Sequence, residues 1–224
     1  DAIHAPASQY YWNIVLPNPS QSTVGGGWYT DFHARFPDGA SIAAGDTITI
    51  SVAGSDAFFT SYGILPDYEL FEDGSGADDV PDMREVFPHS INGTGYTLPD
   101  GTAGTAPSLT NTGEIIVLYY WNGATDLVTD IDVFTWGAGT SFLFSKTGVS
   151  MGGPDAGTTP TAYKADTPTG SQQLFNPVHA YGESFQRVDG SEGTEIKTGG
   201  NGTLGHNETS ENILTTWHTA AATP

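Results

Sequence analysis

Two runs of strand-forming residues separated by an Asn-Gly pair constrain the fold of this chain more than any other feature. The first, Glu114–Trp121, reads EIIVLYYW and is too apolar for a strand with a solvated face, so it predicts a central strand. The second, Leu127–Trp136, reads LVTDIDVFTW, and alternation in its middle places Asp130 and Asp132 on one face, opposite two apolar residues. The pair at 122–123 is preferred in tight primed turns. The sequence therefore predicts an antiparallel hairpin that turns at this Asn-Gly pair.

Elsewhere in the chain, strand signals are frequent and helical signals are rare. Tyr10–Leu16 and Thr47–Val52 are typical of strands, the second with clear alternation. One short helix is expected where Asp56 can cap the run AFFTSY and Gly63 can end it. We therefore predict an all-β fold with long loops and at most one short helix. The expected helix has an apolar face made of Phe58, Phe59 and Tyr62.

The composition narrows the classes of partner and the compartment. The chain has 224 residues, no cysteine and a net charge of −20, from 26 acidic residues against 6 Lys plus Arg. Such a surface repels phosphate backbones, so we expect no nucleic-acid partner. The absence of cysteine excludes a disulfide framework and a cysteine nucleophile. Charged residues make up only 14% of the chain, and Gly, Pro, Ser and Thr take their place, which indicates an extracellular or cell-surface β protein. No apolar run reaches the roughly 20 residues of a membrane span.

Acidic loops are the main candidate sites. A glycine-rich loop at 72–85 carries several carboxylates, whose oxygens are the ligands that Ca²⁺ prefers. Its spacing is not that of an EF-hand, so a solvated acidic loop without metal is the alternative. A second polar cluster, at 206–211, lies in another loop, and either cluster could contain the carboxylate pair of a glycosidase. The residues expected to hold Ca²⁺ are Glu72, Asp73, Asp78, Asp79 and Asp82, and the second cluster consists of His206, Asn207, Glu208 and Glu211.

Motifs of familiar enzyme classes are incomplete in this sequence. Residues 200–205 read GNGTLG, but neither a strand before them nor a helix after them is expected, so we interpret them as a glycine-rich turn and not as a dinucleotide site. Residues 182–186 read GESFQ and lack the second glycine of a nucleophile elbow. The 6 histidines form no H-E-x-x-H or H-x-H pattern. We therefore assign no catalytic residue.

Aromatic residues near the start of the sequence are candidates for contact with a partner. Exposed aromatic rings stack on the pyranose faces of glycans, whereas most aromatic side chains of a β protein lie in its core. The candidates for contact with a glycan or protein partner are Tyr11, Trp12, Trp28 and Tyr29.

Four segments follow one another in the order found in lamin-tail domains. Residues 36–50, FPDGASIAAGDTITI, resemble the early turn and strand of that family, after which a short helix ends at Tyr-Gly. Residues 109–119, LTNTGEIIVLY, resemble the family's L-x-N-x-G-D/E strand. Residues 132–137, DVFTWG, resemble its D-x-apolar-x-W-G strand, and residues 184–189, SFQRVD, resemble its closing strand.

This resemblance implies an immunoglobulin-like β-sandwich, formed by residues 1–224 as a single domain with a long loop insertion around 138–181. It also implies a secreted bacterial protein, because such domains accompany nucleases, phosphatases and surface proteins as accessory modules. The family contributes no catalytic residue, and Trp136 and Arg187 are expected to be structural. The family's opening strand pair is not evident here, so Tyr10–Leu16 is a candidate to pair with an open sheet edge in its own domain or in another copy.

Three functions remain open from the sequence. The leading hypothesis is a non-catalytic extracellular binding or accessory module, with Ca²⁺ as its candidate cofactor and an extracellular protein or a glycan as its partner. The second is a structural subunit that self-associates by strand addition, which an exposed apolar edge strand would favour. The third is a secreted hydrolase, which carboxylates or histidines that converge in one cleft would favour.

Overall fold

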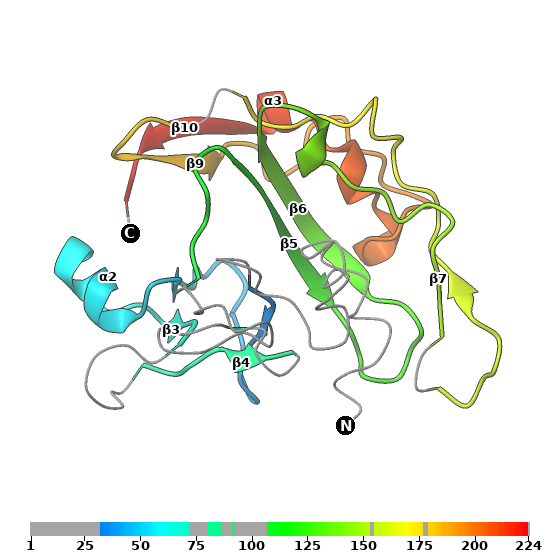
Figure 1. Cartoon of the computed structure of the whole chain (residues 1–224), viewed down its shortest axis with the longest axis horizontal. Coiled ribbons are helices and arrows are strands. Elements are labelled where there is room, and N and C mark those ends of the chain that lie inside the picture. Colours follow the sequence, from blue (N-terminus) through cyan, green and yellow to red (C-terminus); the bar gives the residue numbers. More distant parts are fainter. Residues whose placement is uncertain are drawn as a thin grey trace, which may run out of the picture. The chain divides into compact units, whose positions relative to one another are not determined.

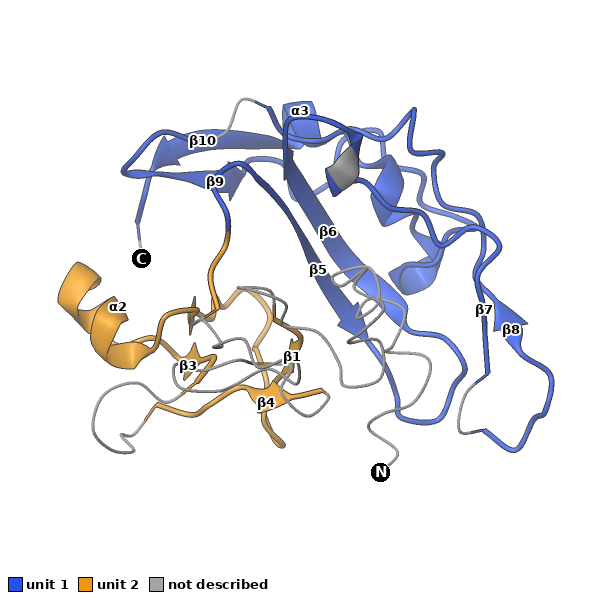
Figure 2. Cartoon of the chain, viewed as in Figure 1, with its two compact units in different colours: residues 1–8, 110–223 blue, residues 9–109, 224 orange. Residues whose placement is uncertain are grey.

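The computed structural model describes residues 32–71, 80–86, 91, 107–152, 155–176 and 179–223. The chain divides into two compact units (Figure 2): unit 1 contains residues 1–8 and 110–223, and unit 2 contains residues 9–109 and 224. The described parts of both units are mostly β with a few short helices, and the strands pair as two-stranded sheets. The predicted β class is therefore confirmed at this level.

Unit 2 contains two small sheets. β1 (Ala34–Arg35) pairs antiparallel with β4 (Arg84–Glu85), and β2 (Ile50–Ser51) pairs parallel with β3 (Tyr68–Glu69). Of the predicted strand at 47–52, only Ile50 and Ser51 are in a strand. The core of this unit has Leu70, Met83 and Ile91 at its centre, with Phe32, Ala34, Phe36, Ile50, Val52, Tyr68 and Phe71 packed around them.

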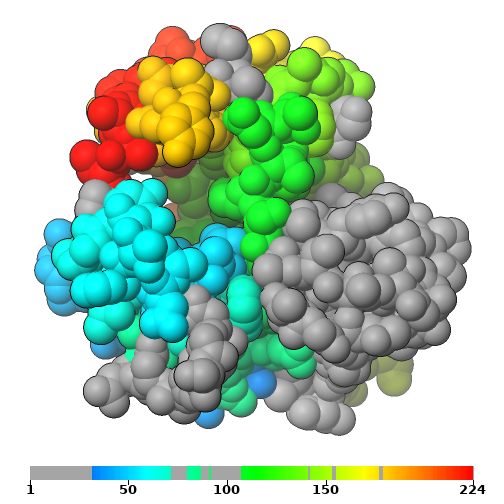
Figure 3. Space-filling view, turned by 60° about the vertical axis from the view of Figure 1, so that its left-hand side comes forward, coloured from blue at the N-terminus to red at the C-terminus, as the bar shows by residue number. Residues whose placement is uncertain are grey.

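The predicted helix is present as α2 (Ser55–Tyr62), which lies at the surface (cyan in Figure 3). It ends as expected, because Gly63 is left-handed, with φ of 74°, and its amide donates to the carbonyl of Phe59. The predicted cap at Asp56 is wrong. Asp56 lies inside the first turn of the helix. The amide of Ser55 donates to Glu69 Oε2 from β3 at 2.6 Å, so a carboxylate distant in sequence accepts this hydrogen bond at the N-terminus of the helix.

In unit 1 the predicted hairpin is confirmed. β5 (Gly113–Tyr120) pairs antiparallel with β6 (Thr129–Gly137), as Figure 1 shows. The connection is wider than a two-residue primed turn, because it includes all residues from 121 to 128. The Oδ1 atom of Asn122 accepts hydrogen bonds from the amides of Ala124 and Thr125, both at 2.9 Å. The Asn side chain therefore organises the loop instead of a primed backbone turn.

A β-bulge corrects the predicted alternation in β6. Asp132 pairs with Leu118 and Asp130 pairs with Tyr119, so Ile131 is an extra residue between them. Asp130 is buried, Asp132 is half-buried and Ile131 is exposed. The two aspartates consequently lie in different environments, and each has its own cationic partner: Lys146 for Asp130 and Arg187 for Asp132.

The predicted central position of the 114–121 strand is wrong for the described residues. Among the strands that the structure describes, β5 pairs with β6 alone, and its apolar residues Ile116, Leu118 and Tyr120 are 40%, 45% and 58% exposed. The inner strand is β6, whose second edge makes parallel bridges from Asp130 to Gly202 and from Trp136 to Phe175. An apolar run identifies a strand, but its place in the sheet depends on these distant segments.

Aromatic residues form the core of unit 1. β9 (Glu183–Arg187) pairs antiparallel with β10 (Trp217–Ala221), and their rings pack against those of β6. Trp136 is buried, and its indole N–H donates to the carbonyl of Thr110 at 3.0 Å, in keeping with its expected structural role. The cluster consists of Phe134, Trp136 and Ile213, with Phe175, Phe185 and Trp217 around them.

The remaining elements of unit 1 are short. They include more helical turns than predicted, because α3 is an α-helix additional to α2 among the described residues. In its single turn, the carbonyl of Asn212 accepts hydrogen bonds from the amides of Thr215 and Thr216. The sequence carries no periodic signal for such a short helix. Within the described ranges, no helix has the length and apolar character needed to cross a membrane. These elements are η2 (Thr140–Phe142), β7 (Ser150–Met151), β8 (Thr161–Ala162), η3 (Thr203–Gly205), η4 (Glu208–Ser210) and α3 (Ile213–Thr216).

Candidate metal centre

Two carboxylates and one imidazole converge in unit 1. Donor atoms of Glu192, Glu195 and His206 all lie within 4.8 Å of one another. His206 Nδ1 is 3.1 Å from Glu195 Oε2 and 3.6 Å from Glu192 Oε2. The Glu195 side chain is 0% exposed, whereas those of Glu192 and His206 are 19% and 24% exposed. The cluster thus has a buried carboxylate at its base and two partly accessible groups above it.

The loop after β9 brings the two glutamates together. Asp189 Oδ1 accepts hydrogen bonds from the amide and the hydroxyl of Ser191, at 2.9 Å and 2.6 Å. The chain then turns twice, because the amide of Glu192 donates to the Asp189 carbonyl and the amide of Glu195 donates to the Glu192 carbonyl. Glu192 and Gly193 are both left-handed, with φ of 63° and 62°. A non-glycine residue is uncommon in this region, so the tight turn is imposed by its surroundings.

A second loop positions the histidine. The amide of Gly200 donates to the carbonyl of Gly205 at 2.8 Å, which closes the segment before His206 into a compact turn. A Cβ atom at Gly200 would collide with the backbone of His206, so this position needs glycine. The predicted glycine-rich turn is therefore present. The two loops are joined where the amide of Asn207 donates to the carbonyl of Ile196 at 2.8 Å.

The electrostatics of the cluster favour an added positive charge. Burial, followed by the neighbouring Glu192 carboxyl, raises the pKa of Glu195 to about 8. Burial, followed by the charges of Glu195 and Glu192, raises the pKa of Glu208 to about 9. Neither oxygen of Glu195 has a hydrogen-bond partner of good geometry, although the His206 ring is close. An ionised carboxylate is costly in such a place, so the site must take up either a proton or a cation.

The donor set indicates which cations fit. Ca²⁺ takes about six to eight oxygen ligands, whereas imidazole nitrogen combined with carboxylate oxygen suits Zn²⁺ and related ions. Glu192, Glu195 and His206 offer two carboxylates and one ring nitrogen, which matches the three protein ligands of a site whose fourth ligand is water. These residues fit a Zn²⁺-type cation better than they fit Ca²⁺.

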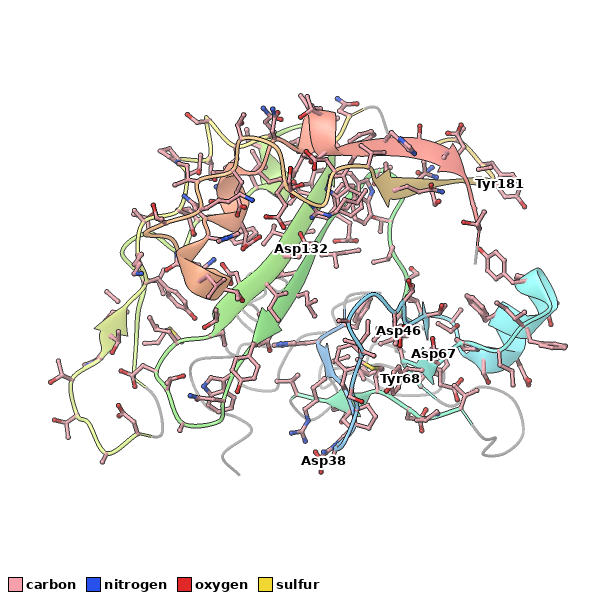
Figure 4. The ribbon with its side chains drawn as sticks, turned by 180° about the vertical axis from the view of Figure 1, so that it is seen from behind. Asp38, Asp46, Asp67, Tyr68, Asp132 and Tyr181 are labelled. Carbon is pink, nitrogen blue, oxygen red and sulfur yellow. The ribbon has the colours of Figure 1, made fainter. Side chains whose placement is uncertain are left out.

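Arg187 supports the loops beside the cluster. Its guanidinium lies 2.6 Å from Asp132 Oδ1 and 2.7 Å from Glu211 Oε1, and it stacks over the ring of Trp217 at 4.7 Å. Asp132 is on β6 and is labelled in Figure 4. It is also 4.0 Å from Glu192 Oε1. Its expected structural role is consistent with these contacts, because it pairs with the buried carboxylate of Glu211 and the half-buried carboxylates of Asp132 and Glu192.

Most of the residues expected to bind Ca²⁺ or a glycan fall outside the described ranges. Asp82 is described; it is exposed and its backbone bridges to Glu69 in unit 2. The loop calcium site and the aromatic contact surface stay predictions. The residues outside the described ranges are Glu72, Asp73, Asp78, Asp79, Tyr11, Trp12, Trp28 and Tyr29.

The second predicted cluster is only partly brought together. His206 joins the candidate metal centre, but Glu211 turns to Arg187, and the Asn207 side-chain oxygen accepts from the Thr209 hydroxyl at 2.7 Å. Sequence reasoning missed the two glutamates that His206 meets. The signal was the E-x-x-E spacing in the glycine-flanked segment GSEGTE at 190–195, which places two carboxylates in one tight loop.

Comparisons of the chain with protein-family models, with curated proteins and with solved structures give no match. The resemblance to lamin-tail domains stays a prediction from the sequence motifs.

Proposed function

We propose that this chain is a non-catalytic extracellular binding or accessory module, and that a divalent cation held by Glu192, Glu195 and His206 stabilises it. One observation carries the proposal: the Glu195 carboxylate is fully buried, without a hydrogen-bond partner of good geometry, beside a second carboxylate and an imidazole. Moving an ionised carboxylate out of water costs several kcal/mol unless an opposite charge lies beside it. A bound cation would offset that cost and lock the two loops together.

The burial of the cluster supports a stabilising role over a hydrolytic one. A catalytic carboxylate must contact its substrate, and the Glu195 side chain is 0% exposed. A secreted hydrolase would instead use the partly exposed Glu192 and His206. Screening the purified chain against ester, glycoside, phosphodiester and peptide substrates separates the two, because turnover that Glu192→Gln or His206→Asn abolishes would support the hydrolase.

The exposed face of β5 supports the binding part of the proposal. Ile116, Leu118 and Tyr120 alternate along one strand and remain exposed. Apolar side chains gathered on one face mark contact surfaces more often than scattered ones do. The partner in this proposal is an extracellular protein or a glycan. The proposed frame is an immunoglobulin-like, lamin-tail-type sandwich, which the order of the four sequence motifs supports.

A structural subunit is the second candidate function. Among the described strands, β5 pairs with β6 alone, and an unpaired strand edge can accept an added strand. The Tyr10–Leu16 segment of another copy is the proposed donor. Light scattering of the full chain and of a variant without residues 1–16 tests this function, because assembly by strand addition requires the donor.

Thermal unfolding tests the cation site. We expect Zn²⁺ added to the chelator-treated full chain to raise its melting temperature, because the ion binds the folded state and not the unfolded one. Glu195→Gln should abolish that increase, since it removes the central ligand charge. Glu183→Gln is the matched control, because it removes one negative charge from another part of the same unit and should keep the increase. Equal melting curves for the wild type with and without Zn²⁺ would refute the site.

A further inference from the structure

Lys146 is buried completely in unit 1 between two carboxylates. Its side chain is 0% exposed, and Nζ lies 2.6 Å from Asp130 Oδ2 and 3.6 Å from Asp166 Oδ2. Each aspartate side chain is only 2% exposed. One amine and two carboxyl groups therefore share a site that solvent does not reach. None of these three residues belongs to the candidate metal centre.

The three residues come from separate segments and are held firmly. Asp130 is on β6, Lys146 lies between η2 and β7, and Asp166 follows β8. Asp166 Oδ2 accepts a hydrogen bond from the backbone amide of Lys146, and its Oδ1 accepts one from Asn201 Nδ2 at 2.8 Å. Asp166 is thus fixed in place, while Asp130 makes the shorter contact with the amine.

Aromatic rings form part of the surroundings of the amine. Lys146 Nζ lies 5.0 Å from the centre of the Phe144 ring and 5.7 Å from that of Tyr163, and both residues are buried. Moving separated charges into such surroundings is expensive, and their mutual attraction repays the cost only in part. A reaction that removes the charges of the amine and of one carboxylate would therefore remove this desolvation cost.

We propose that Lys146 and Asp130 join in an intramolecular isopeptide bond, with Asp166 as the proton carrier. The ammonium first passes a proton to the Asp130 carboxylate across their hydrogen bond, which leaves a neutral amine and a carboxylic acid. Nζ then attacks Cγ of Asp130. Asp166 accepts a proton from the nitrogen and returns it to the departing hydroxyl. The Cγ–O bond breaks, water leaves, and the Cγ–Nζ amide remains, while Asp166 ends unchanged.

The geometry suits this condensation. Nζ already touches a carboxylate oxygen bonded to the carbon that it attacks, and holding reactants in contact replaces much of the entropic barrier of a bimolecular step. The bond would tie β6 to the segment before β7 across 16 positions of sequence. In a chain without cysteine, such a bond would reduce the conformational freedom of the unfolded state, as a disulfide does in other proteins.

Intact mass under denaturing conditions tests the proposal. The full chain, purified folded and incubated to completion, should be lighter than its sequence mass by one water molecule. Trypsin should then fail to cut after Lys146, so that residues 85–164 appear as one peptide that lacks a water. A wild type with the full sequence mass, or a lost water together with normal cleavage after Lys146, would overturn the proposal.

Three variants separate chemistry from folding, with circular dichroism as the check on fold. Asp166→Asn keeps the amine and Asp130 but removes the proton carrier, so the folded variant should have its full mass. Lys146→Arg should also have its full mass. Asp130→Asn should lose ammonia in place of water, because the amide nitrogen becomes the leaving group. A folded Asp166→Asn protein or Lys146→Arg protein that still loses water would contradict the assigned roles.

Discussion

At the scale of single residues, the raised pKa values in the candidate metal centre make stability depend on pH. Glu195 and Glu208 have pKa values of about 8 and about 9 in the folded chain, against an ordinary value of 4.5. The folded state therefore binds protons more tightly than the unfolded state. This contribution to the free energy of unfolding is full below pH 4.5 and is lost as the pH rises toward 8 to 9.

We expect the melting temperature of the chelator-treated protein to fall across that pH interval. Zn²⁺ should reduce the fall, because the ion replaces the protons on the carboxylates. Glu195→Gln should show a smaller fall than the wild type, and this comparison separates the site from the general repulsion within an acidic chain. The measurement is a series of melting curves, and an equal pH dependence in both proteins would argue against the assigned role of Glu195.

The sequence identified one of the three candidate ligands. His206 was part of a recognised polar cluster, but Glu192 and Glu195 reach it only because two loops close on themselves and are then joined by the bond between Asn207 and Ile196. Those contacts are not periodic and depend on backbone conformation. The Lys146 site was also missed, because its three members are far apart in the sequence and only the fold brings them together.

At the scale of elements, the β5–β6 hairpin was predictable because both strands and the Asn122 loop carry local signals. The bulge at Ile131 and the inner place of β6 were not, since they depend on pairing with Gly202 and Phe175. The helix α2 was predicted from its composition and from Gly63, whereas its start depends on Glu69 from β3. Local chemistry therefore predicted where elements lie, and tertiary contacts determined how they end and pair.

The exposed face of β5 leads to a prediction for this element. Leu118 is 45% exposed, so Leu118→Lys should change the melting temperature little while weakening any association or partner contact of this face. Leu214→Lys is the matched control, because Leu214 is 53% exposed on α3, outside β5 and outside the candidate metal centre. Light scattering over a range of concentrations measures self-association. An association that Leu118→Lys leaves intact would exclude this face as the contact surface.

At the scale of the whole molecule, each compact unit has its own apolar core. Phe134 is 6% exposed at the centre of the aromatic cluster in unit 1, so Phe134→Ala should lower the free energy of unfolding by about 3–5 kcal/mol. Phe59→Ala provides a control, because Phe59 is 52% exposed on α2 and its loss should cost little. Denaturant titration measures both. Similar costs for the two variants would show that the aromatic cluster is not the main core of its unit.

The β class of the molecule could be predicted from composition and alternation, whereas its assembly could not. The lamin-tail motifs predict a sandwich, and the described strands form two-stranded sheets in two units. Packing of sheets against each other depends on contacts between residues far apart in sequence, which a pattern of alternating residues does not encode. The β-sandwich therefore remains a proposal, as stated under the proposed function.

Counting the metal bound to the folded chain tests the central claim most directly. The full-length protein is equilibrated with Zn²⁺, freed of unbound ion by buffer exchange and measured by elemental analysis. We predict about one retained ion per chain for the wild type and for Glu183→Gln, and none at this site for Glu195→Gln, because the buried carboxylate is the central ligand. A wild type without bound metal, or equal retention by Glu195→Gln, would contradict the proposed cation-stabilised module.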